Sequence, residues 1–143
     1  LIYLKHLRNL MRLKNAIINI SNLRLRTYIG FNQEEKEKKQ DVVINIEINY
    51  AVTQSVLDDE ISDALNYRDI TKKVIEHVEQ GSFLLLEKLV ADVLDICSQH
   101  QSVNNARVTV DKPYALRFAD SVSITFEYNT ESKSSLRLLG RAS

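Results

Sequence analysis

A carboxylate at position 87 interrupts an otherwise apolar stretch of a predicted helix. The residues three and four positions away from Glu87 are all apolar: Phe83, Leu84, Val90 and Ala91. A carboxylate is costly to bury unless a partner meets it. The pattern therefore indicates either contact with a ligand or a place at the helix N-terminus, where the helix dipole favours an anion.

Three further residues have side chains suited to proton transfer or ligand contact. Lys112 follows the alternating segment Val108–Val110 and precedes Pro113, so we expect it at a strand end beside a rigid turn. Tyr67 begins a predicted helix, and Glu35 lies in a charged loop. All three residue types are also common on protein surfaces, so the pattern by itself leaves their roles open.

Several kinds of site are absent from the sequence. There is no Gly-rich phosphate loop, no His-x-x-x-His pair and no Gly-x-Ser-x-Gly motif. The single cysteine, Cys97, allows no internal disulfide and no multi-cysteine metal site. It continues an apolar stripe and is expected to be inert core, while His77 is expected to pack half-buried. We predict no metal site, a reducing, cytoplasmic location and no membrane-spanning segment, because no apolar run approaches ~20 residues.

The elements that must position these residues follow from hydrophobic periodicity. Period-two alternation predicts four strands, over residues 16–29, 42–52, 106–110 and 121–126. Apolar residues at helical spacing predict two helices. The first lies between Asn66, its N-cap, and Gly81, which stands just past its end, and the second runs over residues 82–99. Residues 32–41 are expected to form a solvated loop. The order ββααββ predicts an α+β domain, a four-stranded antiparallel sheet with two helices on one face.

Charge divides the chain into a body and two tails. The 143 residues hold 19 Lys and Arg against 19 Asp and Glu, yet residues 1–14 and 132–143 contain basic residues and no acidic ones. We expect a basic, flexible N-terminal extension over 1–14, one domain over 15–131 and a basic C-terminal tail over 132–143. Basic ends on a small sheet also suit a nucleic-acid-binding module. The acidic body and the lack of an Arg- and aromatic-rich strand motif argue against it, and we expect no nucleic-acid partner.

Four segments together resemble the dihydroneopterin aldolase family. They are LRLRTYIG at 23–30, DALNYR at 63–68, FLLLEKL at 83–89 and DKPYALRFADSVS at 111–123. The similarity runs in register over about residues 16–128. Within the family the segments are most similar to the branch of dihydroneopterin triphosphate 2′-epimerases.

The resemblance implies a fold, an assembly and a set of site residues. It implies the tunnelling fold (T-fold), with four subunits in a ring, two stacked rings in an octamer and active sites between neighbouring subunits. It places catalytic roles on Lys112, Tyr67 and Glu35, and the anchoring of the pterin ring on Glu87. Further substrate contacts are expected at Leu65, Leu86, Arg24, Arg68 and Arg117, the arginines as candidate phosphate ligands.

The resemblance also implies the chemistry, which is inversion at C2′ of a dihydropterin side chain by a retro-aldol and aldol pair with no metal or cofactor. Because Arg68 and Arg117 lie in segments that look like the epimerase pattern, we favour the epimerase. The first alternative is a dihydroneopterin aldolase that releases glycolaldehyde and 6-hydroxymethyl-7,8-dihydropterin. The second is a non-catalytic pterin- or nucleic-acid-binding module. Presence of Lys112 argues against a mere pterin sensor, which would need Glu87 alone.

Overall fold

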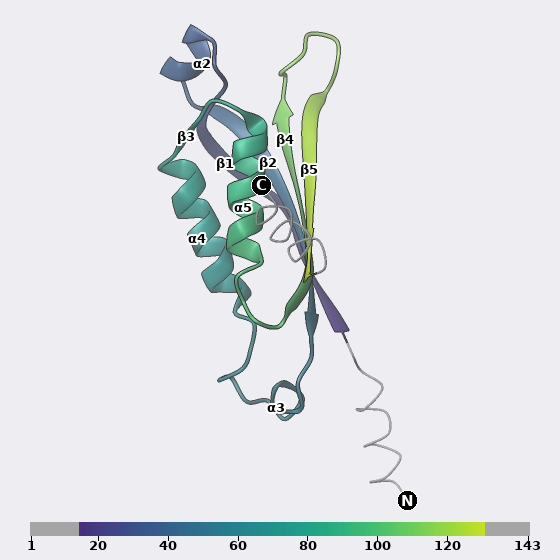
Figure 1. Ribbon diagram of the computed structural model, residues 1–143. Coiled ribbons are helices and arrows are strands. Elements are labelled where there is room, and N and C mark those ends of the chain that lie inside the picture. Colours follow the sequence, from purple (N-terminus) through teal and green to yellow (C-terminus); the bar gives the residue numbers. More distant parts are fainter. Residues whose placement is uncertain (1–14, 131–143) are drawn as a thin grey trace, which may run out of the picture.

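The computed structural model describes residues 15–130, and the predicted tails at 1–14 and 132–143 lie outside the described residues. The chain forms a curved sheet with two helices packed on one face (Figure 1). The sheet has five strands in the order β3-β1-β2-β4-β5. The strands are β1 (Asn15–Ile29), β2 (Gln40–Ala51), β3 (Ser82–Phe83), β4 (Val103–Pro113) and β5 (Ser121–Asn129). The helices are α2 (Gln33–Glu37), α3 (Gln54–Leu57), α4 (Tyr67–Glu79) and α5 (Leu86–Cys97).

The long strands pair antiparallel, as the alternation predicts. β1 pairs with β2, β2 with β4, and β4 with β5. The alternate residues of β2 that face the helices are almost completely buried: Val42, Ile44, Ile46 and Ile48. One irregularity interrupts β1 between Ile20 and Leu23, where Asn22 takes a positive φ of 54° and its N–H donates to Asn45 Oδ1 at 2.9 Å. Asparagine tolerates this conformation better than most residues, so the strand continues past the bulge.

The two long helices close the core from one side. α4 begins after Asn66, whose Oδ1 accepts from the N–H groups of Arg68 and Asp69 at 3.1 and 3.2 Å, as the predicted N-cap should. The buried residues of α4 are Ile70, Val74 and Val78, and those of α5 are Leu89, Val90, Val93 and Cys97. Burial raises the pKa of the Cys97 thiol to about 12, which keeps it protonated and unreactive, as expected of a core cysteine.

Short elements are where the sequence prediction differs from the structure. Ser82 and Phe83 pair in parallel with Tyr28 and Ile29 as β3, so the second long helix begins at Leu86 rather than at residue 82. This fifth strand at the sheet edge escaped the periodicity analysis because two residues show no period. Residues 33–37, predicted as loop, form the helix α2, and α3 is a further single turn between β2 and α4.

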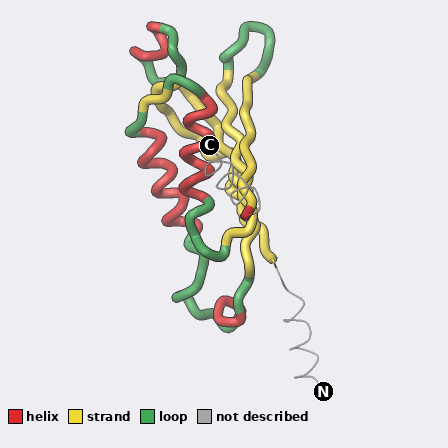
Figure 2. The backbone as a smooth tube through the Cα atoms, viewed as in Figure 1, coloured by secondary structure: helices red, strands yellow, loops and turns green. Residues whose placement is uncertain are grey.

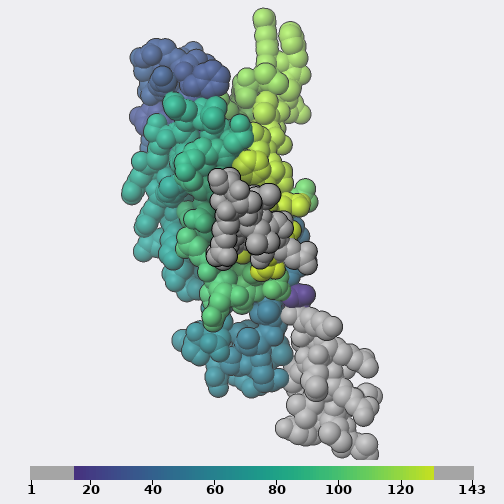
Figure 3. Space-filling model, in the orientation of Figure 1, coloured from purple at the N-terminus to yellow at the C-terminus, as the bar shows by residue number. Residues whose placement is uncertain are grey.

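The elements divide the molecule into two ends. Strands and helices run roughly along the same long axis, so the loops gather at the two ends of the sheet (Figure 2). The segment around α2 and the connection between β4 and β5 project from one end with a hollow between them (Figure 3). α3 and the start of α4 lie at the other end (Figure 1). Each end therefore carries its own set of the sequence-predicted site residues.

Candidate active site

Lys112 is placed by the register of β4. It continues the row of residues that face the helices after Val108 and Val110, which are fully buried. Lys112 takes the next position of this row, near the end of β4. Its side chain is 13% exposed, and its amino group forms an ion pair with the carboxylate of Glu35, which is 20% exposed. Two predicted site residues that are 77 positions apart are thus in direct contact.

Glu35 is held in place by the helix in which it lies. Asn32 caps α2: Asn32 Oδ1 accepts from the Glu35 N–H at 2.8 Å, and the Asn32 N–H donates to Glu35 Oε1 at 3.4 Å. This reciprocal arrangement is a capping box. The hydrogen bond from Lys112 lowers the pKa of Glu35 against the opposing effect of burial, with smaller contributions from Asn32 and Gln40. Glu35 is therefore held as a carboxylate beside the amino group of Lys112.

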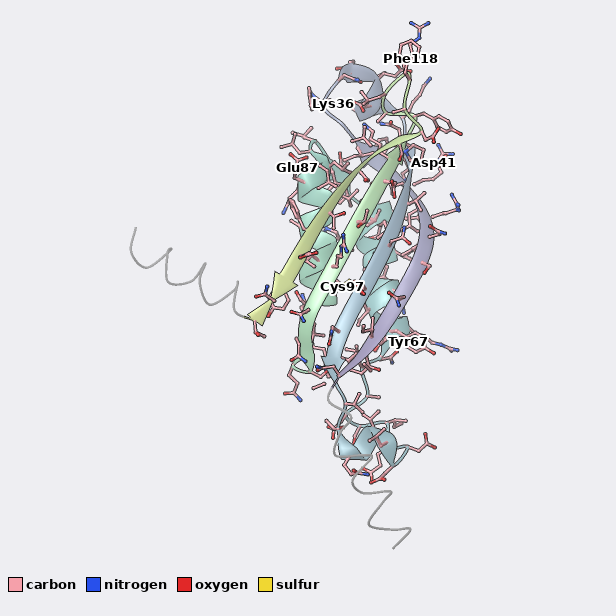
Figure 4. The ribbon with its side chains drawn as sticks, turned by 90° about the vertical axis from the view of Figure 1, so that its right-hand side faces the viewer. Lys36, Asp41, Tyr67, Glu87, Cys97 and Phe118 are labelled. Atoms are coloured by element: carbon pink, nitrogen blue, oxygen red, sulfur yellow. The ribbon has the colours of Figure 1, made fainter. Side chains whose placement is uncertain are left out.

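Glu87 lies at the same end of the molecule, in the first turn of α5 (Figure 4). The Gly30 N–H donates to Phe83 O at 2.9 Å, which ties the end of β1 to β3 and to the short segment that leads into α5. Leu86 packs partly buried against the core, whereas Glu87 is exposed. The apolar neighbours seen in the sequence do not enclose this carboxylate, because the helix turns it outward. It is left to solvent at a helix N-terminus, where an anion is favoured.

Tyr67 and Arg68 lie at the opposite end of the helical layer from Glu87 (Figure 4). Tyr67 is 53% exposed and lines a shallow groove along α4 with Arg68 and Lys72. Leu65, just before this helix, is 8% exposed and belongs to the core of the chain, so it faces inward. Within one chain the structure does not bring Tyr67 to the pair of Glu35 and Lys112.

The remaining two arginines lie on different elements, Arg24 on β1 and Arg117 in the connection between β4 and β5. Arg24 is exposed on β1 and alternates with buried Leu25, so it points to the sheet face away from Lys112. It lines a groove there with Arg26 and Tyr114. Arg117 lies in the connection between β4 and β5, at the end that carries Lys112, with its guanidinium 5.6 Å from the centre of the Phe118 ring. Arg24 is level with Asp111 through Val43, so it lies at the same end of the sheet as Lys112 but on the other face, whereas Arg117 lies in the connection that follows β4 at that end.

Two contributors to this site escaped the sequence analysis. Asn32 carried a usable signal, because an Asn followed three residues later by Glu is a capping-box pattern. Gly30 directly follows the first predicted strand, and the sequence shows nothing more about it. In the structure its φ is 127°, a value that residues with a side chain rarely adopt. Both act on Glu35 and so determine where its carboxylate lies.

Across residues 15–130 there is no group of three or more His, Cys, Asp or Glu side chains that could hold a metal ion. In the same range, none of the helices is both long and apolar enough to cross a membrane. His77 is accounted for by its contacts: its ring tilts against Phe83 and its Nε2 lies 2.7 Å from Asp92 Oδ2. The ring packs on Phe83 as expected, but its side chain is 44% exposed, so it lies nearer the surface than the predicted half-buried position.

Comparison with known proteins gives a consistent result. The sequence model of the family described as dihydroneopterin aldolase (FolB) matches residues 18–127. A dihydroneopterin triphosphate 2′-epimerase of Escherichia coli K12 is 53% identical over 113 residues, which cover 79% of this chain and 94% of that protein. The enzyme of the same name from Pseudomonas aeruginosa PAO1 is 51% identical over 110 residues, 77% of this chain and 89% of that protein.

The fold is similar to that of a solved member of the family. The crystal structure of E. coli dihydroneopterin aldolase in complex with neopterin superimposes with a TM-score of 0.73 at 28% sequence identity. The match covers 80% of this chain and 99% of that one. The epimerases are thus nearly twice as similar in sequence as this aldolase is.

Proposed function

Since this chain belongs to the dihydroneopterin aldolase family, we propose that it is a dihydroneopterin triphosphate 2′-epimerase, converting 7,8-dihydroneopterin triphosphate to 7,8-dihydromonapterin triphosphate. The observation that carries the proposal is the 51–53% identity to two epimerases over most of the chain, against 28% to an aldolase of known structure. The ion pair between Glu35 and Lys112 supports it, because it places a proton-transfer group at an open end of the sheet.

The proposed reaction breaks and re-forms one carbon–carbon bond. Protonation at N5 makes the C6=N5 bond of the dihydropterin an electron sink. Loss of the proton from the 2′-hydroxyl then breaks the C1′–C2′ bond, which gives an enamine and an aldehyde fragment. Addition of the enamine to the other face of the aldehyde inverts C2′ and returns both protons. Lys112 transfers the hydroxyl proton through a bound water, and Glu35 holds the lysine amino group in place.

Glu87 is proposed to anchor the pterin ring. A carboxylate offers two acceptor oxygens, which match the hydrogens on the 2-amino group and on N3 of a pterin. Glu87 is exposed in the first turn of α5, at the end of the sheet that carries Lys112, so a flat ligand can reach both residues. Leu86 beside it offers an apolar contact for the ring.

A second copy of the chain is proposed to supply Tyr67. The tyrosine is exposed at the far end of the helical layer, which leaves the site incomplete in one chain but lets a neighbouring subunit contribute it. We propose a ring of four subunits, two of which stack as an octamer, with each site between neighbours. Arg68, which lines the same groove as Tyr67, would join the site from the same neighbour.

Mixing two inactive variants tests the shared site. In a mixture of Tyr67→Phe and Lys112→Ala subunits, a site that takes Lys112 from the first and Tyr67 from the second is intact. Random reassembly should restore about a quarter of the sites, because each site draws one residue from each of two subunits. No recovery after verified subunit exchange would contradict the shared site.

The product distinguishes the proposed epimerase from an aldolase. The protein is incubated with dihydroneopterin triphosphate, and the products are dephosphorylated, oxidised and separated by chromatography. Monapterin is the expected product, whereas 6-hydroxymethylpterin would identify an aldolase, the activity named by the matching family model. If the protein converts neither the triphosphate nor free dihydroneopterin, the proposal that it is an enzyme of this family is wrong.

Arg117, Arg68 and Arg24 are proposed as phosphate ligands, and Arg117 lies in the connection that directly follows Lys112 and Pro113. Arginine presents paired N–H donors that suit phosphate oxygens. Replacing Arg68 and Arg117 together by Gln should reduce the preference for the triphosphate over free dihydroneopterin. An unchanged preference would remove both from this role.

A further inference from the structure

Gly30 makes room for the carboxylate of Glu35. It ends β1 with a φ of 127°, and a Cβ at this position would overlap the carboxylate carbon and both oxygens of Glu35. One of these oxygens, Oε2, meets the amino group of Lys112, and the other, Oε1, accepts from the Asn32 N–H. The space left by the missing side chain at position 30 is therefore filled by half of the ion pair in the candidate site.

The backbone is held on the N-terminal side of Gly30, which limits how far it can move to relieve such an overlap. Its N–H donates to Phe83 O at 2.9 Å, and the preceding residue, Ile29, is 1% exposed in the core. Ile29 O also accepts from Gln40 Nε2 at 2.7 Å. A side chain added at position 30 would have to displace the group that can move, which is the Glu35 side chain.

Glu35 in turn has few other places to go. Asn32 holds α2 through both halves of the capping box, so the backbone of Glu35 stays close to Gly30. A displaced carboxylate would leave Lys112 for solvent and break the ion pair.

We propose that Gly30 is a positioning residue for the reaction: its lack of a side chain is what allows Glu35 to hold Lys112 in its working position. This inference rests on the proposed function. It predicts that Gly30→Ala lowers kcat as Glu35→Ala does, while the dissociation constant for neopterin, an unreactive ligand anchored by Glu87, stays within about threefold of wild type.

A double-mutant cycle on turnover tests the proposal. Gly30→Ala is measured alone and together with Glu35→Ala, by conversion of dihydroneopterin triphosphate. If Gly30 acts through Glu35, the double variant has the kcat of Glu35→Ala alone to within about threefold. If the two losses multiply, Gly30 acts through the backbone, and the proposal is wrong. Val93→Ala, a core change on α5, controls for a general loss of stability.

Folding provides a second readout if Gly30→Ala alone does not fold. Removing the overlapped atoms in the double variant should then restore the folded circular dichroism spectrum, because the crowding is gone. A double variant that is also unfolded would show that the positive φ alone excludes alanine, which would overturn the proposal.

The coupling between Glu35 and Lys112 can also be measured without turnover. Urea denaturation of Glu35→Gln, Lys112→Met and the double variant gives their coupling, and this coupling should vanish when alanine replaces Gly30. A coupling unchanged by Gly30→Ala would refute the inference while leaving the proposed function standing. If wild type converts neither pterin, the proposed function fails, and the proposed role in turnover fails with it.

Discussion

Replacing Lys112 by arginine separates the charge of this residue from its ability to transfer a proton. The ion pair with Glu35 needs only a cation, and a guanidinium supplies one. The guanidinium of arginine stays protonated in proteins, so it cannot take up a proton from the substrate. Lys112→Arg should therefore keep the structure and lose the chemistry.

The expected loss follows from the role proposed for the lysine. General acid–base catalysis by a positioned side chain contributes about 10²–10⁴-fold to a rate, which corresponds to about 2.7–5.4 kcal/mol of transition-state stabilisation. We expect kcat of Lys112→Arg to fall within this range. The free energy of unfolding should change by less than about 1 kcal/mol, because the partly buried pair with Glu35 is preserved.

Lys112→Met is the matched control, because it keeps the length of the side chain and removes the charge. It should lose turnover to a similar extent and also lose stability, by about 1–3 kcal/mol, since Glu35 is left 20% exposed without its partner. Turnover is measured from monapterin formed after dephosphorylation and oxidation, and stability from urea denaturation. If Lys112→Arg turns over within threefold of wild type, roughly the scatter of such measurements, the lysine transfers no proton.

Three other predictions concern binding, pH and packing. Glu87→Ala should weaken neopterin binding about 10- to 100-fold, the effect of losing a charged hydrogen-bond pair. The urea midpoint should not change, because Glu87 is exposed. Unaltered affinity in a fluorescence titration would show that Glu87 is not the anchor of the ring. The pKa of Glu35 is lower in the folded protein than in the unfolded chain, so its ion pair stabilises the fold above the unfolded pKa, and this stabilisation is lost as pH falls through the folded-state pKa. The difference in unfolding free energy between wild type and Glu35→Gln should therefore shrink on acidification. A difference that stays constant from pH 7 to about 3 would disprove this. Leu89→Ala should lower the free energy of unfolding by about 2–5 kcal/mol, and Leu84→Ala, at an exposed position, by less than about 0.5 kcal/mol, both measured by urea denaturation. Equal losses would contradict the burial of Leu89 in the core.

The sequence by itself determined the long elements, because their signals are local and repeated. The apolar residues of β2 alternate over most of its length, and the apolar residues of α4 recur once per turn after an Asn cap. Patterns of this length survive the influence of tertiary contacts. The types of the site residues were also readable, since Lys112 and Glu87 stood out from their neighbours and the four family-like segments gave them roles.

The short elements were decided by contacts distant in sequence. β3 has two residues and exists because it pairs with the end of β1, more than 50 positions away in the chain. That pairing delays the start of α5 to Leu86 and leaves Glu87 in its first turn, exposed rather than enclosed. No local pattern of two residues carries this information.

Only the tertiary structure decided which of the predicted site residues meet. It brought Glu35 and Lys112 together across 77 positions through the register of β4 and the cap of α2, and it placed Tyr67 at the other end of the molecule. It also gave Gly30 a role, since the overlap of a Cβ with Glu35 depends on a backbone dihedral and on a neighbour in space. Residue types follow from the sequence, whereas distances between side chains follow from how strands pair and helices pack.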